Sequence, residues 1–243
     1  MHFTSPLLRG VLIKRYKRFL ADVTLENGEV VTAHCPNSGS MLSVDLPGSE
    51  VWLSRASNPK RKLGYTWELI RVGDDLVGIN TNRPNALVAE AIESGTIAEL
   101  AGYDAVRREV KYGQNSRIDL LLESPGRPQC YVEVKNVTLK RDSEPGGLVE
   151  FPDAVTARGE KHLVELANMI RMGHRAVMVY LVQRSDGGRF TIAHDIDTKY
   201  ARALRLAMAA GVETVCYLCS VSIEEIRVER PIPVIMPGGN GQD

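Results

Sequence analysis

SRIDLLLESPGRPQCYVEVKNVT, residues 116–138, consists of two apolar runs separated by the turn-forming residues 124–128. Proline and glycine between alternating apolar residues predict a β-hairpin. With the turn centred there, residues whose numbers sum to about 252 face each other, so Asp119 lies opposite Glu133. Lys135 points to the same side as Glu133, because strand side chains alternate between the two faces. The hairpin therefore brings two carboxylates and one ammonium group together.

Such a trio suits the binding of a divalent metal and the hydrolysis of a phosphodiester. Mg²⁺ prefers hard oxygen ligands and usually keeps several waters or substrate phosphates. We expect Asp119 and Glu133, with the backbone carbonyl of Val134, to bind Mg²⁺ or Mn²⁺. We expect Lys135 to position or activate an attacking water, or to offset charge on the phosphorane. The alternative that spacing alone leaves open is a cross-strand ion-pair cluster with no ligand.

Five segments spread along the chain carry distinctive motifs. They are RYKRFLADV (15–23), HCPNSGSM (34–41), SRIDLLL (116–122), YVEVKNVTL (131–139) and FPDAVTARGEKHLVEL (151–166). Over nearly the whole chain this set resembles the sugar fermentation stimulation protein A (SfsA) family. Asp119 followed by Glu133-Val134-Lys135 is similar to the core of the PD-(D/E)XK nucleases, although Ile118 stands where the nuclease pattern has proline.

The resemblance implies an α/β fold with a mixed sheet. Residues 1–82 are expected to form a small OB-like barrel that binds nucleic acid, and residues 83–236 a PD-(D/E)XK nuclease-like domain. Residues 237–243 are expected to be a flexible tail. The implied function is DNA binding without marked sequence specificity, linked to the regulation of sugar (maltose) metabolism.

Charge and cysteine content narrow the class of protein. The formal net charge of the 243 residues is zero, but residues 1–62 hold nine Lys or Arg against five Asp or Glu, which predicts a basic N-terminal part. No apolar run approaches the length of about 20 residues that a membrane helix needs. Four cysteines are too few for a disulfide framework in a chain this long. We therefore expect a cytoplasmic protein, with association to the nucleoid as a further expectation. The oligomeric state is not indicated.

Residues 7–80 alternate between apolar and polar positions over several short runs, with Asn27-Gly28 as a hairpin signal. Five or so closely spaced strands favour a small barrel, for which the OB-fold is the natural candidate. Such barrels bind nucleic acid through basic grooves and stacking aromatic residues. The candidate aromatic residues here are Tyr16 and Phe19 in one basic segment, and Tyr65 and Trp67 in another. The alternative is a solvated charged edge. The candidate DNA-binding residues are Lys14, Arg15, Tyr16, Lys17, Arg18, Lys60, Arg61 and Lys62.

A linker at residues 81–85 precedes a predicted helix at 85–94, for which Asn82 or Asn85 is the expected cap. The resemblance implies that an acid on this helix points into the metal site, and Glu90 is the candidate. Residues 140–152 are expected to form a long polar loop. A helix at 153–172 carries an apolar face and a polar stripe that is either exposed or grips phosphate. The members of this stripe are Arg158, Lys161, His162 and Glu165.

The C-terminal third predicts a buried strand at 175–182, a helix at 198–210 and a strand at 215–221. Cys216 and Cys219 form a CxxC on that last strand. We expect it to be inert, because a zinc site normally needs a second pair and because positions i and i+3 of a strand face opposite sides. The absence of a GxGxxG after a strand argues against a dinucleotide-binding fold.

Three classes of function remain open from the sequence. The first is a Mg²⁺-dependent phosphodiesterase, and the second is a DNA-binding regulator whose nuclease-like site is idle. The third, a carbohydrate enzyme with paired carboxylates, is poorly supported, because Lys135 and a basic helix face suit phosphate better than sugar. The intact set of Asp119, Glu133 and Lys135 favours the first class, but the sequence does not settle catalysis.

Overall fold

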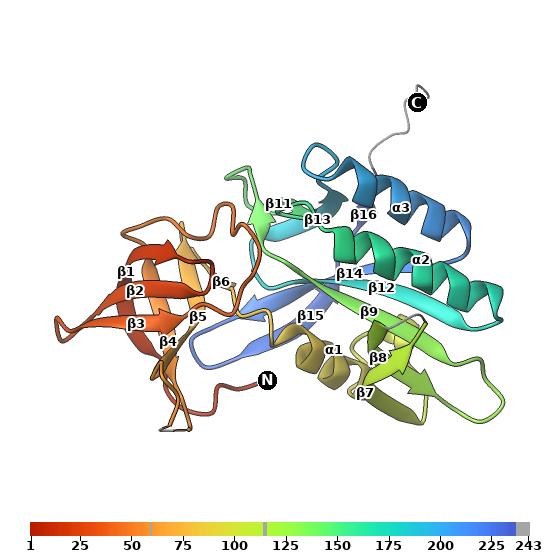
Figure 1. Cartoon of the computed structure of the whole chain (residues 1–243), viewed down its shortest axis with the longest axis horizontal. Coiled ribbons are helices and arrows are strands. Elements are labelled where there is room, and N and C mark those ends of the chain that lie inside the picture. The colour runs from red at the N-terminus through yellow and green to blue at the C-terminus, as the bar shows by residue number, and fades with distance from the viewer. Residues whose placement is uncertain (59, 114–115, 237–243) are drawn as a thin grey trace.

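The computed structural model describes residues 1–58, 60–113 and 116–236. The chain folds into an N-terminal barrel and a larger mixed sheet with helices on both faces, which lie side by side (Figure 1). This arrangement confirms the expected fold class. The predicted tail, residues 237–243, lies outside the described residues.

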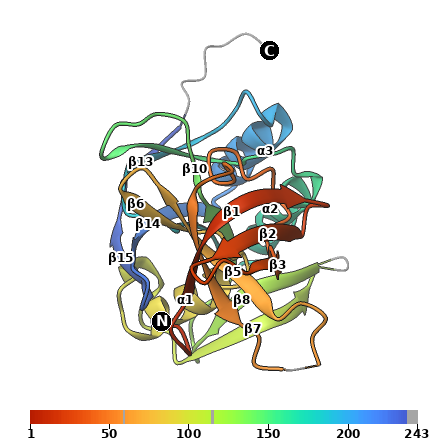
Figure 2. The ribbon, with the colours of Figure 1, turned by 90° about the vertical axis from the view of Figure 1, so that its left-hand side faces the viewer.

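The barrel is built from short strands whose alternate side chains point inward, as Ala21, Val23 and Leu25 do. The strand order is β3-β2-β1-β4-β5-β6, and a parallel contact between His34 of β3 and Thr66 of β5 closes the barrel. Figure 2 views the molecule from the barrel side. The strands are β1 (Leu8–Tyr16), β2 (Leu20–Leu25), β3 (Val30–His34), β4 (Glu50–Arg55), β5 (Tyr65–Val72) and β6 (Asp75–Gly78).

The main sheet of the second part has the order β15-β14-β12-β9-β8-β7. Its centre is parallel, because β9, β12 and β14 run in the same direction, and the other pairs are antiparallel. The strands are β7 (Ala105–Tyr112), β8 (Ser116–Glu123), β9 (Cys130–Val137), β12 (Arg175–Val182), β14 (Glu213–Val221) and β15 (Ile226–Pro231). The pairing of Leu120 with Val132 and of Leu121 with Tyr131 confirms the predicted hairpin register.

Helices cover this sheet on both faces (Figure 1). α2 (Ala157–Arg171) and α3 (Thr198–Ala209) pack on one face, and α1 (Pro84–Glu93) packs on the other. A short 3-10 turn (Ala98–Leu100) follows α1. Cys216 belongs to the core under α2 and α3, whereas Cys219 belongs to the core on the α1 side. The two thiols therefore face opposite sides of β14, as the strand geometry predicts.

A second, smaller sheet takes up both ends of the long loop that we expected at residues 140–152, and only residues 141–146 remain a loop between its strands. Its order is β10-β11-β13-β16, with β11 parallel to β13. Its strands are β10 (Leu139–Lys140), β11 (Gly147–Phe151), β13 (Gly187–Ile192) and β16 (Val234–Ile235). The partner of β11 lies about forty residues further along the chain, so local sequence signals do not reveal it.

Both helix starts next to the cleft differ from the prediction. α1 begins at Pro84 after Arg83, whose side chain makes no cap bond, and neither Asn82 nor Asn85 caps it. A proline at the first position needs no donor there, so the helix can begin without a side-chain cap. α2 begins at Ala157 and not at residue 153. Thr156 caps it by accepting a hydrogen bond from the Gly159 N–H at 3.1 Å.

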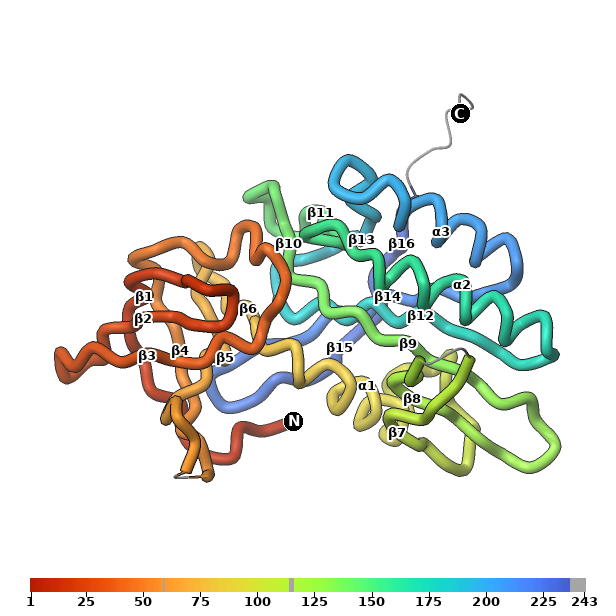
Figure 3. The backbone as a smooth tube through the Cα atoms, in the orientation of Figure 1, coloured from red at the N-terminus to blue at the C-terminus, as the bar shows by residue number. Residues whose placement is uncertain are grey.

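The barrel lies next to the main sheet (Figure 3). Backbone contacts and a shared core hold the two parts together. The N–H of Gly78 donates to the carbonyl of Gln183 at 2.7 Å. Trp52 and Leu69 of the barrel belong to the core on the α1 side of the main sheet. At the N-terminus, Phe3 donates to the carbonyl of Glu224 at 2.9 Å. The surfaces of the two parts that face each other are therefore fixed in position.

The buried cysteines lead to a test of the CxxC. Replacing Cys216 and Cys219 together with serine should leave the metal content of the purified protein unchanged. It should lower the free energy of unfolding by about 1–3 kcal/mol per site, because a hydroxyl would be buried without a designed partner. Elemental analysis and urea unfolding measure the two outcomes. Stoichiometric zinc that disappears in the double variant would contradict the inert assignment.

Candidate metal and nucleic-acid site

The site lies where β8 and β9 separate. Backbone pairing between the two strands covers residues 120–122 and 130–132 and stops there. Beyond this point the carboxylate of Asp119, through Oδ2, accepts the N–H of Val134 at 2.7 Å. A side chain thus takes the place of the next ladder hydrogen bond, and the edge of β9 from Glu133 onward is left facing a cleft.

The carboxyl group of Asp119 is held on both oxygens. Oδ2 accepts from Val134, and Oδ1 accepts from the side-chain amide of Asn85 at 2.9 Å. Burial, followed by the neighbouring Glu133 carboxylate, raises the pKa of Asp119 to about 6. Asn85 also donates to Glu109, whose φ of 54° is unusual for a residue other than glycine. Asn85 is therefore part of the site and not a helix cap.

Glu133 is only 2% exposed, and its two carboxylate oxygens have different surroundings. Oε1 accepts from the Lys135 ammonium at 2.6 Å and contacts Nδ1 of His162 on α2. Burial alone would raise the pKa of Glu133, but Lys135 and His162 together hold the pKa below its usual value. Among the described residues, Oε2 has no hydrogen-bond partner. A buried carboxylate oxygen without a partner is costly and needs an explanation.

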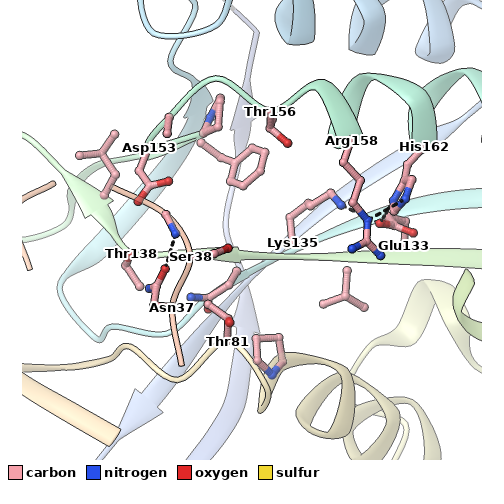
Figure 4. Close-up of a pocket in the computed structure, with 18 of the residues that line it drawn as sticks. Asn37, Ser38, Thr81, Glu133, Lys135, Thr138, Asp153, Thr156, Arg158 and His162 are labelled. Atoms are coloured by element: carbon pink, nitrogen blue, oxygen red, sulfur yellow. Dashed lines mark hydrogen bonds and ion pairs between the residues drawn. The ribbon is translucent and has the colours of Figure 1, made fainter. Parts of the chain in front are cut away.

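A cavity of 410 Å³ extends from these residues toward the barrel. One wall consists of Thr81, Pro84 and Asn85, and the opposite wall of residues 150–156 and Arg158. The far end is formed by Asn37, Ser38 and Gly39 of the barrel, so both parts of the chain contribute (Figure 4).

The structure places the accessory candidates in three different environments. Arg158 lines the cavity, and its Nε donates to Nε2 of His162 at 3.4 Å. Lys161 lies one turn away, 3.7 Å from the buried Glu165, and does not line the cavity. Glu90 lies outside the cavity and is 57% exposed, with its carboxylate 3.1 Å from the amino group of Met1. Glu90 is therefore removed from the set of candidate ligands.

The candidate DNA-binding residues also divide into distinct groups. Arg15 is 11% exposed, and its donors are directed at backbone carbonyls and not at solvent. Lys17 and Arg18 form an exposed turn with positive φ values, and Lys60, Arg61 and Lys62 are exposed as well. Lys14 is exposed and lies over the ring of Tyr16, whose hydroxyl donates to Asp22.

Two of the aromatic residues that we expected to stack with bases, Trp67 and Tyr65, are completely or partly buried. Trp67 is completely buried in the barrel, and its indole N–H donates to the carbonyl of Leu69 at 2.8 Å. The residues of β5 from 66 to 70 are all buried, so Trp67 belongs to the barrel core. Tyr65 is half-buried, with the Arg55 guanidinium 5.6 Å from the centre of its ring.

Sequence reasoning missed two features of the cavity, namely its barrel end and Asp153. Asp153 accepts the N–H of Met41 at 2.8 Å, and its backbone carbonyl accepts the hydroxyl of Ser40. A signal was present, because the motifs at residues 34–41 and 151–166 are both distinctive. Their separation of more than a hundred residues hid the fact that they meet.

Two family models match consecutive parts of the chain. Residues 82–225 match the family described as "Sugar fermentation stimulation protein RE domain", and residues 13–79 match "SfsA N-terminal OB domain". The chain belongs to the SfsA family. The "Sugar fermentation stimulation protein homolog" of Rhodospirillum rubrum is 60% identical and covers 98% of this chain and 100% of its own. The homolog of Geobacter sulfurreducens is 56% identical over 97% of this chain and 99% of its own.

A solved structure within the SfsA family has the same fold. The structure of Pyrococcus furiosus SfsA in complex with Ca²⁺ matches with a TM-score of 0.86 at 25% identity. The match covers 97% of this chain and 98% of that chain.

The donor set of this SfsA chain fits a divalent metal of the Mg²⁺ type. Among the described residues, no group of three His, Cys, Asp or Glu side chains is arranged to hold a metal, so a site of the zinc type is not preformed there. Two carboxylates are nevertheless enough for Mg²⁺, which completes its shell with waters and phosphate oxygens. The unpartnered Oε2 of Glu133 is the group that such an ion would satisfy.

Across residues 1–58, 60–113 and 116–236, no helix has both the length and the apolar character to cross a membrane.

The raised pKa of Asp119 leads to a prediction for metal-free protein. Because this pKa is higher in the folded state than the unfolded value of about 3.9, the folded protein binds the proton more tightly. The ionised carboxylate therefore destabilises the fold above about pH 6, and the penalty fades as the pH falls toward about 4. Asp119→Asn removes this charge, but its NH2 group replaces one of two accepting oxygens and faces a donor. Compared with wild type, its free energy of unfolding should therefore be about 1–2 kcal/mol more favourable at about pH 7.5 than at about pH 4.5.

Urea unfolding in EDTA at both pH values measures this effect. Asp74→Asn, at an exposed position outside the cavity, is the matched control and should change stability little at either pH. A stability difference between wild type and Asp119→Asn that is the same at both pH values would contradict the raised pKa of Asp119.

Proposed function

We propose that this SfsA chain is a DNA-binding protein with a metal-dependent phosphodiesterase site in its second part. The observation that carries the proposal is the buried, unpartnered Oε2 of Glu133 next to the Asp119 carboxylate, in a cavity large enough for a nucleotide-sized ligand. Lys135 and Arg158 supply positive charge in the same cavity, which suits a phosphate.

Asp119, Glu133 and the backbone carbonyl of Val134 would hold the metal, Mg²⁺ or Mn²⁺. In a ladder the N–H and the C=O of a residue point to the same neighbouring strand. Since the N–H of Val134 is directed at Asp119, its carbonyl is directed toward the same open edge of β9. Three hard oxygen ligands on one side leave the remaining positions for water and phosphate.

When bound, the ion supplies polarisation of a phosphoryl oxygen and lowers the pKa of an attacking water. The protein groups orient the reactants around it. His162 fixes the Oε1 side of Glu133, so Oε2 stays directed at the ligand. Lys135, which is 15% exposed, lies beside Glu133 and offsets charge on the phosphorus centre or orients the water. Arg158 is exposed at the rim and is suited to hold a non-bridging phosphate oxygen.

The Ca²⁺ complex of the Pyrococcus furiosus relative supports a divalent ion in this family. Ca²⁺, Mg²⁺ and Mn²⁺ share a preference for oxygen ligands. The name of the curated relatives supports a link to the regulation of sugar metabolism, which we propose as the biological context.

We propose residues 1–82 as the DNA-binding module and residues 83–236 as the catalytic module. Exposed cations on the barrel, at Lys14, Lys17 and Arg18, support electrostatic binding without marked sequence preference. All four cysteines carry free, buried thiols, which supports a reducing cytoplasm with the nucleoid as the site of action.

A second candidate is a DNA-binding regulator whose nuclease-like site is idle. The observation that favours it is the network of hydrogen bonds already present without metal. Both oxygens of Asp119 and one oxygen of Glu133 have donors. Such a cluster is also a stable ion-pair network in its own right.

Metal titration separates the two candidates. Asp119→Asn and Glu133→Gln should each weaken Mn²⁺ binding by at least about 10- to 100-fold, the range for loss of even an outer-shell partner. Lys135→Ala should spare metal binding, because the ammonium is not a ligand, and it should lower the turnover of any phosphodiester hydrolysis. Isothermal calorimetry measures binding, and a panel of linear, nicked, single-stranded and branched DNA with an EDTA control measures cleavage.

Glu90→Gln is the matched control for this titration. It removes a carboxylate from α1 at an exposed position outside the cavity, so Mn²⁺ affinity should equal that of wild type. Identical binding curves for wild type and Asp119→Asn would leave the regulator as the better candidate. Metal binding without cleavage of any substrate in the panel would also favour it.

Salt dependence tests the proposed DNA surface. Replacing Lys14, Lys17 and Arg18 with alanine should flatten the log–log salt slope of duplex binding by about 2–3 units, because each released counterion contributes close to one unit. Arg15 is left intact, since its donors bind backbone carbonyls. Replacing the exposed Lys199 and Arg202 of α3 is the control. If only the replacement of Lys199 and Arg202 flattened the salt slope, the DNA-binding surface would lie on the α3 side and not on the barrel.

A further inference from the structure

The two ends of the cavity differ in chemistry (Figure 4). At the Glu133 end lie the side chains of Lys135, Arg158 and His162, which suit a phosphate. At the barrel end the cavity is lined by neutral polar groups and by the carboxylate of Asp153, and by no lysine or arginine among the described residues. A second phosphate at this end would meet no cation.

The barrel end carries a hydroxyl without a partner. Ser38 is exposed and lines the cavity, and no hydrogen bond joins its side chain to any residue in the described ranges. Its neighbours in the chain are fully engaged. Asn37 is buried and donates from its amide to the carbonyl of Ile79 at 3.2 Å, and its Oδ1 accepts the N–H of Gly39 at 2.9 Å. Ser38 is thus the residue of this loop that remains available to a ligand.

The backbone on both sides of Ser38 is held by Arg15. Its Nη2 donates to the carbonyl of Asn37 at 3.0 Å and to the carbonyl of Gly39 at 2.8 Å, and Nη1 donates to Ser40 at 3.2 Å. A planar guanidinium is suited to such multiple contacts, whereas a lysine ammonium is not. Arg15 therefore determines the position of the loop from the barrel side.

Asp153 holds the same loop from the other side of the cavity. It accepts the N–H of Met41 at 2.8 Å. A Cβ atom at Gly39 would lie 2.5 Å from the Asp153 carboxylate, so a larger residue there would require Asp153 to shift. The loop is fixed before any substrate arrives, which is the property of a positioning surface.

We infer that the cavity takes one unpaired nucleotide, with its phosphate at Asp119 and Glu133 and its sugar or base against Ser38. Ser38 is then a substrate-contacting residue, and Arg15 and Asp153 are positioning residues. This inference rests on the proposed function and deepens it, because it names the state of the substrate as single-stranded or locally unpaired.

Confinement of the cavity between two walls supports an unpaired nucleotide over a duplex. Thr81 and Pro84 bound one side, residues 150–156 bound the other, and the barrel loop bounds the end. In a duplex a base is stacked between its neighbours and its hydrogen-bonding edge is occupied by the partner base. Enzymes that take a base into a pocket act on single strands or extrude the base from the helix. The half-open cavity here, bounded on three sides, would likewise admit a base only after it has left the stack.

A short probe tests the inference without depending on cleavage. A fluorescently labelled thymidine trinucleotide is titrated in Mn²⁺ and followed by anisotropy, in parallel with a blunt duplex. Ser38→Ala should weaken trinucleotide binding by about 3- to 10-fold, the usual effect of one lost hydrogen bond, and should leave duplex binding unchanged. Ser57→Ala, at an exposed barrel position outside the cavity, should change neither. Equal affinities of wild type and Ser38→Ala for the trinucleotide would overturn the inference.

A double-mutant cycle tests the positioning role of Arg15. Arg15→Met should weaken trinucleotide binding at least as much as Ser38→Ala, and the double variant should be little weaker than Arg15→Met alone, because both changes remove the same contact. Arg15→Lys should restore only part of the affinity. A purely structural role for Arg15 would give additive losses, and that result would remove Arg15 from the site.

The outcomes separate this inference from the proposed function. Trinucleotide binding that depends on Ser38, with no cleavage of any DNA, would support the pocket and reject the phosphodiesterase. Cleavage that depends on Asp119 and Glu133 but is unaffected by Ser38→Ala on single-stranded substrate would support the phosphodiesterase and reject the pocket.

Discussion

The hydrogen bond from the Val134 N–H to the Asp119 carboxylate determines where the cleft forms. It ends the pairing of β8 with β9 after residues 120 and 132 while still satisfying a backbone donor that would otherwise be orphaned. If the ladder continued, the edge of β9 from Glu133 onward would be covered by β8. The same bond directs the peptide of Val134 at the open side, so one interaction creates both the space and the orientation of the oxygens around it.

The charges around this edge are arranged to tolerate burial. Asp119 and Glu133 have pKa values that move in opposite directions, because Lys135 and His162 contact Glu133 while Asp119 has only neutral donors in direct contact. Two adjacent carboxylates cannot both ionise cheaply, and the environment assigns the charge to Glu133 first. A proton on Asp119 removes the remaining repulsion, and the proposed divalent ion would do the same. This explains why the cluster is compatible with both candidate functions.

Local signals predicted the elements that depend on local chemistry. The hairpin register was predicted to the residue, because the turn at 124–128 and the alternation of apolar side chains leave one arrangement. Sequence signals failed to predict strands whose pairing partner is remote in the chain. They also failed where one type of side chain can serve two purposes. β11 pairs with β13 about forty residues away, and Arg15 has the same side chain as a phosphate-binding arginine although it binds carbonyls. On α1, the helical pattern located the buried face but not the edge that meets the cleft. Glu90 was therefore expected in the site, and Asn85 was expected only as a cap.

The position of the barrel gives the strongest argument that the two parts of the chain act together. An OB-type barrel on a flexible linker can bind DNA for a neighbouring domain without touching its active site. Here the loop at residues 37–41 is bonded to Asp153, and Trp52 and Leu69 are buried in the core on the α1 side of the main sheet. The barrel therefore cannot move away without exposing apolar surface and removing one end of the cavity. Two motifs separated by more than a hundred residues, at 34–41 and 151–166, meet at that end, so the cavity exists only when both parts are folded and in contact.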